Sequence, residues 1–390
     1  MPLTGIRVVD LTRILAGPYA TMTLADMGAD VLKIERPGTG DDTRAWGPPF
    51  HDGMSTYFLA VNRNKRSMTL NLKEESAIAI LWQLLGQADV VVSNFRSGVM
   101  DQLGLGYESV ASRCPRIVYG VINGYGDSGE SASRPSFDVI AQAESGLMEM
   151  TGAADGPPTK VGISLADEVA GLVLVQGVLL ALLARQRTRR GQKVEVALRD
   201  ALMSLFTYQA QAYLSAGQAP RRMGNEHPSI VPYQTFEAAD GVLVVGVGNE
   251  AAWGRFCEVL SARDLLDDNR FATNSDRVQH RGILTEKLTE RFACAPVAEW
   301  LQALEGASIP CGRVTSAAEA FDDPLTFERE MRVSIPGTDV EVTGIPVKMS
   351  ATPGVVRTAP PALGSDTNEV LTELGHTAAQ IDAWRVAGVI

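Results

Sequence analysis

The chain has 390 residues and a mass of 41.7 kDa, and its 46 acidic and 35 basic residues give a formal net charge of −11. This length predicts two or three domains, and a composition of 45% hydrophobic and 21% charged residues excludes a disordered chain or a small disulfide scaffold. The negative charge argues against nucleic acid and anionic membranes as partners, so a polyanionic ligand needs a local basic patch. Four scattered cysteines and an N-terminus without a signal-peptide pattern make us expect a cytoplasmic protein.

Strands and helices alternate along the first half of the chain. The apolar patterns predict strands at 6–11, 30–35, 67–72, 89–94, 117–123 and 193–198, and helices that include 17–27, 74–86 and 170–184. Such alternation is typical of a parallel sheet with helices on both faces, so residues 1–216 are expected to form a doubly wound, Rossmann-like α/β domain. The apolar stretch 170–184 is shorter than the ~20 residues that span a bilayer, and we expect a buried core helix there.

A second, smaller domain is expected after a linker rich in Gly, Pro and Arg at 217–227. Residues 225–322 contain a β-hairpin signal at 233–247 and three helical segments, which indicates an α+β domain. Residues 323–390 carry short β-like pieces and a helical tail, and we expect this segment to return to the large domain.

Several common catalytic motifs are absent from the sequence. No G-x-G-x-x-G, no G-x-x-x-x-G-K-[ST], no G-x-S-x-G and no clustered His or Cys pattern occurs. We therefore expect no tightly bound cofactor and no metal site.

Cations follow three of the predicted strands. Arg36, Lys73 and Arg96 each stand just beyond a strand's carboxyl end, where open α/β sheets bind their ligands. Each alone is equally well explained as a solvated loop charge, but three at one edge of an acidic protein indicate an anion such as the phosphates of a nucleotide-like molecule.

Asp167 stands just before the long apolar helix. One hypothesis is an ordinary helix N-cap, and the other is a carboxylate held ionised by the helix dipole beside donors that stabilise an oxyanion. The residues alone leave both hypotheses open.

The sequence resembles the class III CoA-transferases, the family that includes the formyl-CoA:oxalate and carnitine CoA-transferases. The resemblance covers nearly the whole chain, through GIRVVDLTRILAGPYATMTLADMGADVLKIERPGTGD, NRNKRSMTLNL, NGYGDSG, RPSFDVIAQAESGLMEMTG, RTRRGQKVEVALRDAL, GNEHPSIVPYQTF and RFATNSDRV. It implies two interlocked chains in a homodimer. It also implies that coenzyme A and acyl-CoA are substrates, together with a free carboxylic acid, and the family's frequent dicarboxylic donors make succinyl-CoA a candidate.

The resemblance assigns roles to residues. Asp167 matches the nucleophile, which forms an aspartyl anhydride and then an aspartyl-CoA thioester. The implied CoA-binding positions are Leu15, Ala16, Arg36, Leu70, Asn71, Leu72, Lys73, Asn94, Phe95, Arg96, Gln102, Arg134, Phe137 and Asp138.

Three departures from formyl-CoA transferase limit this transfer of roles. Leu15 replaces a glutamine, Gln102 replaces an arginine for which Arg96 is a substitute, and GNEHPSIVPY occupies the place of a glycine-rich loop. These departures argue against formate and oxalate as substrates. His227 in that loop is a candidate for binding a substrate carboxylate, although a lone histidine is more often structural.

Two alternatives remain. An α-methylacyl-CoA racemase-like enzyme would need a histidine immediately before Asp138, where this chain has Phe137. A non-catalytic acyl-CoA binding protein would bind CoA and show no change when Asp167 is replaced.

Overall fold

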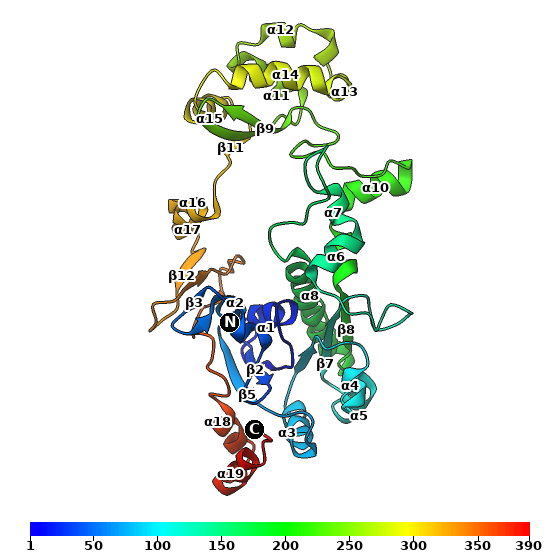
Figure 1. The fold of residues 1–390 in the computed structure, drawn as a ribbon, viewed down its shortest axis with the longest axis vertical. Helices are drawn as coiled ribbons and strands as arrows, with labels where there is room; N and C mark the ends of the chain where they lie inside the picture. The colour runs from blue at the N-terminus through cyan, green and yellow to red at the C-terminus, as the bar shows by residue number, and fades with distance from the viewer. The chain divides into compact units, whose positions relative to one another are not determined.

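A six-stranded parallel sheet forms the centre of the computed structural model, which describes residues 1–390. The strands are β1 (Arg7–Asp10), β2 (Asp30–Glu35), β5 (Lys65–Thr69), β6 (Val90–Ser93), β7 (Val118–Asn123) and β8 (Lys193–Ala197). Their order is β5-β2-β1-β6-β7-β8, and every neighbouring pair is parallel. The prediction of a parallel α/β sheet is confirmed (Figure 1).

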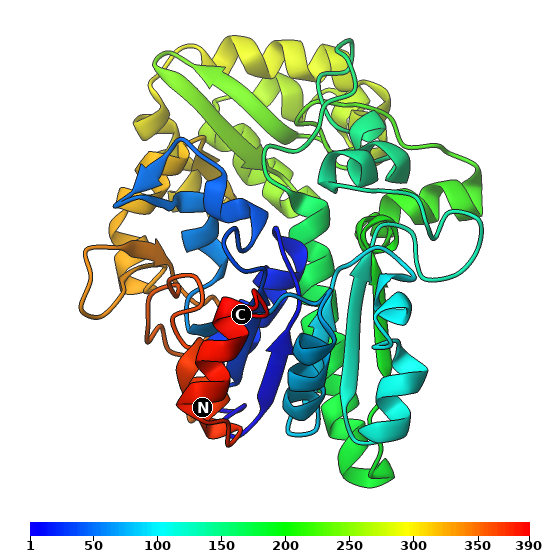
Figure 2. The same cartoon turned by 60° about the horizontal axis from the view of Figure 1, so that its bottom comes forward.

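Helices cover both faces of this sheet. One face carries α1 (Ala16–Asp26), α6 (Asp138–Ser145), α8 (Leu165–Thr188) and α9 (Leu198–Ser204), whose apolar side chains share one core with the strands. The other carries α3 (Glu75–Leu85), α4 (Val99–Gln102), α5 (Tyr107–Arg113), α18 (Thr367–Glu373) and α19 (Ala378–Val386), around a second core. Figure 2 shows the C-terminal helices α18 and α19 beside the first strands of the sheet.

The order of the strands reverses beside β1. From β1 the chain moves outward to β2 and β5, and then returns to place β6 on the other side of β1. A crevice outside the carboxyl ends of two such strands is where open α/β sheets bind ligands. The segments after β1 and β6 therefore define the place to look for the site.

Helix α8 is only partly a core helix. Its Ala170, Leu174, Val178 and Ala181 are buried against the sheet, whereas Leu172, Leu179, Leu180 and Leu183 are exposed in the single chain. The expectation of a buried core helix over 170–184 is therefore met on the face that packs against the sheet and not on the opposite face. By length and composition alone α8 is also long and apolar enough to cross a membrane, a test that core helices pass as well.

The chain divides into two compact units. The first consists of Met1–Leu147, Lys160–Ala216 and Pro324–Ile390, and the second of Met148–Thr159 and Gly217–Asp323. The first unit also contains η1 (Asp42–Ala45), β3 (Phe50–His51), β4 (Met54–Ser55), α2 (Thr56–Val61), α10 (Thr207–Ala216), α17 (Pro324–Glu328), β12 (Arg332–Ser334) and β13 (Glu341–Thr343), while α7 (Leu147–Met150) begins at its border.

The second unit is a small sheet packed against helices. The hairpin of β9 (Tyr233–Ala238) and β10 (Gly241–Gly246) pairs with β11 (Cys311–Arg313) in antiparallel fashion. Around it lie α11 (Glu250–Val259), α12 (Arg263–Leu266), η2 (Asn269–Phe271), α13 (Asn274–Gln279), α14 (Arg281–Phe292), α15 (Val297–Gly306) and α16 (Ala317–Asp322). Stacked Phe236 and Phe292, with ring centroids 4.7 Å apart, form part of its core.

Candidate active site

Asp167 lies at the start of α8 and lines a cavity of about 160 Å³ at the carboxyl edge of the sheet. The cavity is bounded by the turn after β1, the segment after β6 and the end of β7. Three arginines, Arg13, Arg96 and Arg134, line it together with Asp167. Two of these arginines already have carboxylate partners, since Arg13 pairs with Asp42 at 3.2 Å and Arg134 with Glu144.

Asp167 is not the N-cap of its helix. Ser164 holds that position, and Asp167 is the third helical residue. The capping hydrogen bond comes from another helix, because Asp138 Oδ1 accepts from the N–H of Ala166 at 2.8 Å. Asp138, which the sequence grouped with CoA-binding positions, thus fixes the first turn of α8, and Gln142 Nε2 donates to its other oxygen at 2.8 Å.

The environment of Asp167 favours its neutral form. Burial, together with the nearby carboxylates of Asp138 and Glu168, raises the pKa of Asp167 to about 7. Of the two hypotheses for Asp167, the carboxylate held ionised by the helix dipole disagrees with this raised pKa, because burial and the neighbouring carboxylates disfavour the charged form. A carboxyl group whose pKa lies near 7 is poised to exchange between both forms at neutral pH.

The turn after β1 forms one wall of this cavity. Leu15 and Ala16, both predicted as binding positions, line it, and so does Arg13. Arg13 is not among the predicted positions, although it follows β1 in the same way as Arg36, Lys73 and Arg96 follow their strands. The same strand-end argument would have found it.

A second residue that the sequence did not reveal is Tyr57 of α2. Burial and the charge of Asp167 raise the pKa of the Tyr57 hydroxyl, which also hydrogen-bonds to the side chain of Ser164. The phenol therefore lies beside the first turn of α8. Nothing in the local sequence around Tyr57 signals this proximity, which arises from packing between distant segments.

A larger cavity of about 490 Å³ adjoins the first at the same edge of the sheet. Arg36, Lys73 and Arg96 all line it, so the three cations after separate strands do come together. Leu70, Leu72 and Phe95 add apolar walls, and Arg13, Phe95 and Arg96 are common to both cavities. A groove with cations and apolar surface, opening beside a carboxyl group, suits a long ligand that has phosphates at one end.

The remaining predicted residues have individual positions. Phe137 is 58% exposed and lines the first cavity, as does Arg134, which pairs with Glu144 at 2.5 Å and stacks over Tyr125. Asn71 lines the second cavity, and its N–H donates to the carbonyl of Val389. Gln102 is exposed at the end of α4 and lines neither cavity.

His227 belongs to the second unit and is held by local contacts there. Its Nδ1 accepts from the N–H of Ser229 at 3.1 Å, and its ring packs on Tyr233 with centroids 5.4 Å apart. Burial and the charge of Arg281 lower the pKa of His227. These contacts are those of a histidine that shapes its own loop.

The fold and these cavities define an α/β protein with a cation-lined crevice and a perturbed carboxyl group at the switch point of its sheet. A model of CoA-transferase family III matches residues 3–367, and the chain belongs to that family. It is therefore a class III CoA-transferase, and the resemblance seen in the sequence is confirmed.

Relatives of known activity match over almost the full length. The succinyl-CoA:glutarate CoA-transferase of Mus musculus is 40% identical over 401 residues, which cover 100% of this chain and 90% of the relative. The acetyl-CoA:oxalate CoA-transferase of Acetobacter aceti is 41% identical over 350 residues, covering 90% of this chain and 89% of the relative. A crystal structure of a CaiB/BaiF family protein from Brucella suis has 39% identity and a TM-score of 0.86 over 96% of this chain and 99% of that one.

Proposed function

We propose that this enzyme moves CoA between dicarboxylic acids, with succinyl-CoA or a related thioester as donor and Asp167 as the nucleophile. The observation that carries the proposal is the cavity that Asp167 lines together with Arg13, Arg96 and Arg134, beside the cation-lined groove. The groove suits the phosphates of CoA. The arginines of the smaller cavity suit a carboxylate at the far end of the acyl group.

In the proposed reaction the carboxyl group of Asp167 is bonded first to the donor acyl group and then to CoA. An oxygen of ionised Asp167 attacks the thioester carbonyl, the C–S bond breaks, and CoA leaves as a thiolate, which gives a mixed anhydride. The thiolate attacks the Asp167 carbonyl, releases the donor acid as a carboxylate and forms an aspartyl-CoA thioester. The acceptor carboxylate then attacks the aspartyl-CoA thioester and releases the CoA thiolate, which gives a second mixed anhydride. The thiolate attacks the acceptor's carbonyl in this anhydride, which forms the new acyl-CoA and releases Asp167 as a free carboxylate.

The acceptor names of the relatives support the dicarboxylate preference, whereas the donor named for the Acetobacter aceti enzyme, acetyl-CoA, is the thioester of a monocarboxylic acid. Both relatives described above are named for dicarboxylic acceptors, glutarate in one and oxalate in the other. Because a relative with 41% identity is named for oxalate, Leu15 and the 224–233 loop are not sufficient grounds to exclude oxalate as a substrate. Oxalate belongs in the substrate panel.

A covalent trapping experiment tests the role of Asp167. The enzyme is incubated with succinyl-CoA, treated with borohydride or hydroxylamine, and its mass and modified peptide are determined. We expect modification at Asp167 that disappears in Asp167→Ala and persists in Glu168→Gln, which removes the neighbouring carboxylate. An adduct elsewhere, or exchange that survives in Asp167→Ala, would refute the proposed nucleophile.

The substrate preference has its own test. Succinyl-CoA is paired with glutarate, oxalate and monocarboxylic acids of matched length, and kcat/KM is compared. We expect the dicarboxylates to be preferred, and preference for the monocarboxylates would contradict this part of the proposal.

We also propose that the active form is a homodimer in which a second copy covers the apolar surface of α8 and α10. None of the ten residues of α10 is fully buried in the single chain, with Tyr208, Tyr213 and Leu214 exposed, and α8 also presents exposed leucines. A helix this short is marginal without packing. Light scattering after size exclusion is expected to give twice the 41.7 kDa chain mass, and a monomer would refute the dimer.

A further inference from the structure

The turn from β1 into α1 has an unfavourable backbone conformation. Ile14 has a φ of 73°, in the left-handed region that β-branched residues rarely adopt. Such strain costs of order 1–3 kcal/mol and persists only where surrounding groups enforce it. The turn also forms a wall of the cavity that Asp167 lines. The groups that hold the turn in this conformation therefore determine the shape of that wall.

Asn94, in the segment after the neighbouring strand β6, holds the residue before Ile14 from both sides. Its Oδ1 accepts from the N–H of Arg13 at 3.0 Å, and its Nδ2 donates to the Arg13 carbonyl at 2.7 Å. Both ends of the amide are therefore engaged by the main chain. These two hydrogen bonds join the segment after β6 to the turn after β1.

Asp41 holds Ile14 itself. Both carboxylate oxygens lie 3.2 Å from the N–H of Ile14. Asp41 is buried and paired with buried Lys33, with Nζ 2.9 Å from Oδ2, and the charge of Lys33 helps keep the pKa of Asp41 below its usual value despite the burial.

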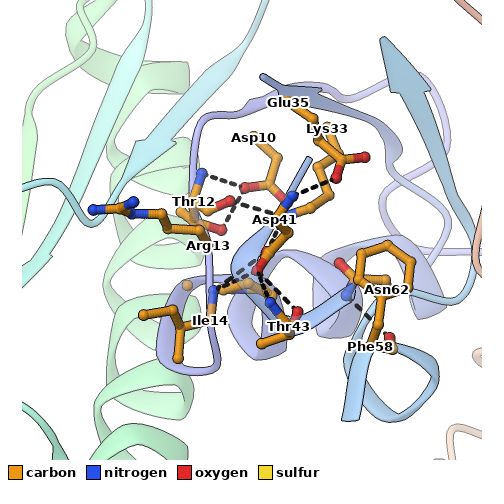
Figure 3. A network of polar contacts seen from close by, with 12 residues as sticks. Asp10, Thr12, Arg13, Ile14, Lys33, Glu35, Asp41, Thr43, Phe58 and Asn62 are labelled. Carbon is orange, nitrogen blue, oxygen red and sulfur yellow. Dashed lines mark hydrogen bonds and ion pairs between the residues drawn. The ribbon is translucent and has the colours of Figure 1, made fainter. Parts of the chain in front are cut away.

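The same lysine closes the network on the other side of the turn (Figure 3). Lys33 Nζ donates to the carbonyl of Thr12 at 2.8 Å, and the N–H and hydroxyl of Thr12 donate to Asp10. The backbone from Thr12 to Ile14 is thus bound at five of its polar groups by four side chains, three of them buried. Fully satisfied networks of this kind define one conformation.

The N–H groups of the next two residues are left without a partner in the chain. Leu15 has no capping bond at the start of α1, and Ala16 is the first residue of that helix. Both residues line the cavity with Asp167. The conformation of Ile14 fixes where they stand relative to the nucleophile.

We propose that Asn94 and Asp41 are positioning residues, which hold Ile14 in its left-handed conformation and thereby place Leu15 and Ala16 against Asp167. Asn94 acts on the turn and not as a ligand of CoA, which revises the role that the family resemblance implied. The inference rests on the proposed function, because it takes Asp167 as the reacting group.

Steady-state kinetics of Asn94→Ala separate the two roles. Loss of positioning lowers kcat about tenfold or more and leaves KM for the CoA thioester within threefold of wild type, because a small misplacement acts on the chemical step. Loss of a CoA ligand instead raises KM with little change in kcat. A raised KM alone, or unchanged kinetics, overturns the proposal. Asn368→Ala, an exposed asparagine of α18, serves as the control and is expected to keep wild-type kinetics.

A double variant supplies a readout that general destabilisation does not produce. Glycine adopts a positive φ readily, so in the Asn94→Ala background Ile14→Gly lets the turn keep its conformation without the hydrogen bonds from Asn94. We expect kcat to recover at least threefold relative to Asn94→Ala alone, and a double variant that is no faster overturns the proposal. Trapping of wild type is run in parallel. If exchange occurs without an adduct at Asp167, the nucleophile assignment fails while the kinetics still decide whether Asn94 acts on kcat or KM.

Discussion

Gly171 lets the helix that carries Asp167 approach the turn after β1. It lies one helical turn after Asp167 on the same face of α8. A Cβ added there would stand 2.8 Å from the carbonyl oxygen of Ala16 and 3.1 Å from Cδ1 of Tyr19. The oxygen belongs to the main chain and cannot rotate away, so in Gly171→Ala the two helices must separate.

The size of the effect follows from that contact. To reach an ordinary distance of 3.4 Å from the oxygen, the Cβ must retreat by about 0.6 Å. Misplacing a catalytic group by about 1 Å costs about 10²-fold in rate, so a shift of this size is expected to lower kcat roughly tenfold. Overpacking costs about 1–3 kcal/mol of stability, and the better helix propensity of alanine offsets about 1 kcal/mol of that.

The assay measures kcat for exchange of CoA between succinyl-CoA and a free acid, with thermal unfolding measured in parallel. Gly254→Ala is the matched control, because Gly254 is inside α11 with open space around it. There the same substitution is expected to leave kcat unchanged and to stabilise the protein by about 0.5–1 kcal/mol. Wild-type kcat in Gly171→Ala, or a loss of activity that matches the loss of folded protein, would refute the reasoning.

Three further predictions concern charge at the two cavities. The pKa of Asp167 is raised to about 7 in the folded protein, so its ionisation begins to oppose folding above pH 4 and does so fully above pH 7. Asp167→Asn removes this cost. In chemical denaturation it is expected to stabilise the protein by up to about 4 kcal/mol at pH 8 and hardly at all at pH 4. An equal effect at both pH values would contradict that sign. Asp138→Asn keeps an acceptor for the Ala166 N–H but removes a charge that raises the pKa of Asp167, so the acid limb of kcat/KM is expected to move from near pH 7 to lower pH, and an unmoved limb would count against the coupling. Arg36→Ala and Lys73→Ala are each expected to raise KM for CoA thioesters about tenfold with kcat retained, and a fall in kcat alone would place the phosphates elsewhere.

Local patterns predicted the sheet well because each strand is a short apolar run with a clear end. The strand at 30–35 has the same bounds in the structure, and 193–197 forms the last strand beside β7. The end of each run also located Arg36, Lys73 and Arg96, since parallel strands bring their carboxyl ends to one edge.

Features that depend on packing between distant segments were outside the reach of such patterns. The pKa of Asp167 depends on Asp138 in another helix, and the position of Tyr57 depends on how α2 packs near α8. The role of Asn94 depends on a hydrogen bond across the switch point to a residue 81 positions earlier. The exposed leucines of α8 were indistinguishable from its buried ones, because the helix is apolar on all sides.

The C-terminal segment completes the core under the first strands of the sheet. Leu371, Ile381 and Val389 are buried in that core, and the N–H of Asn71 donates to the carbonyl of Val389. During synthesis the part of this face that α18 and α19 cover therefore stays open until residues 367–389 have been made, whereas the unit around Gly217–Asp323 has all its strands and helices before then. The unit with the parallel sheet is thus completed after the smaller unit, although its first strands are made earlier, and a chain broken off before residue 367 would expose those apolar side chains to aggregation.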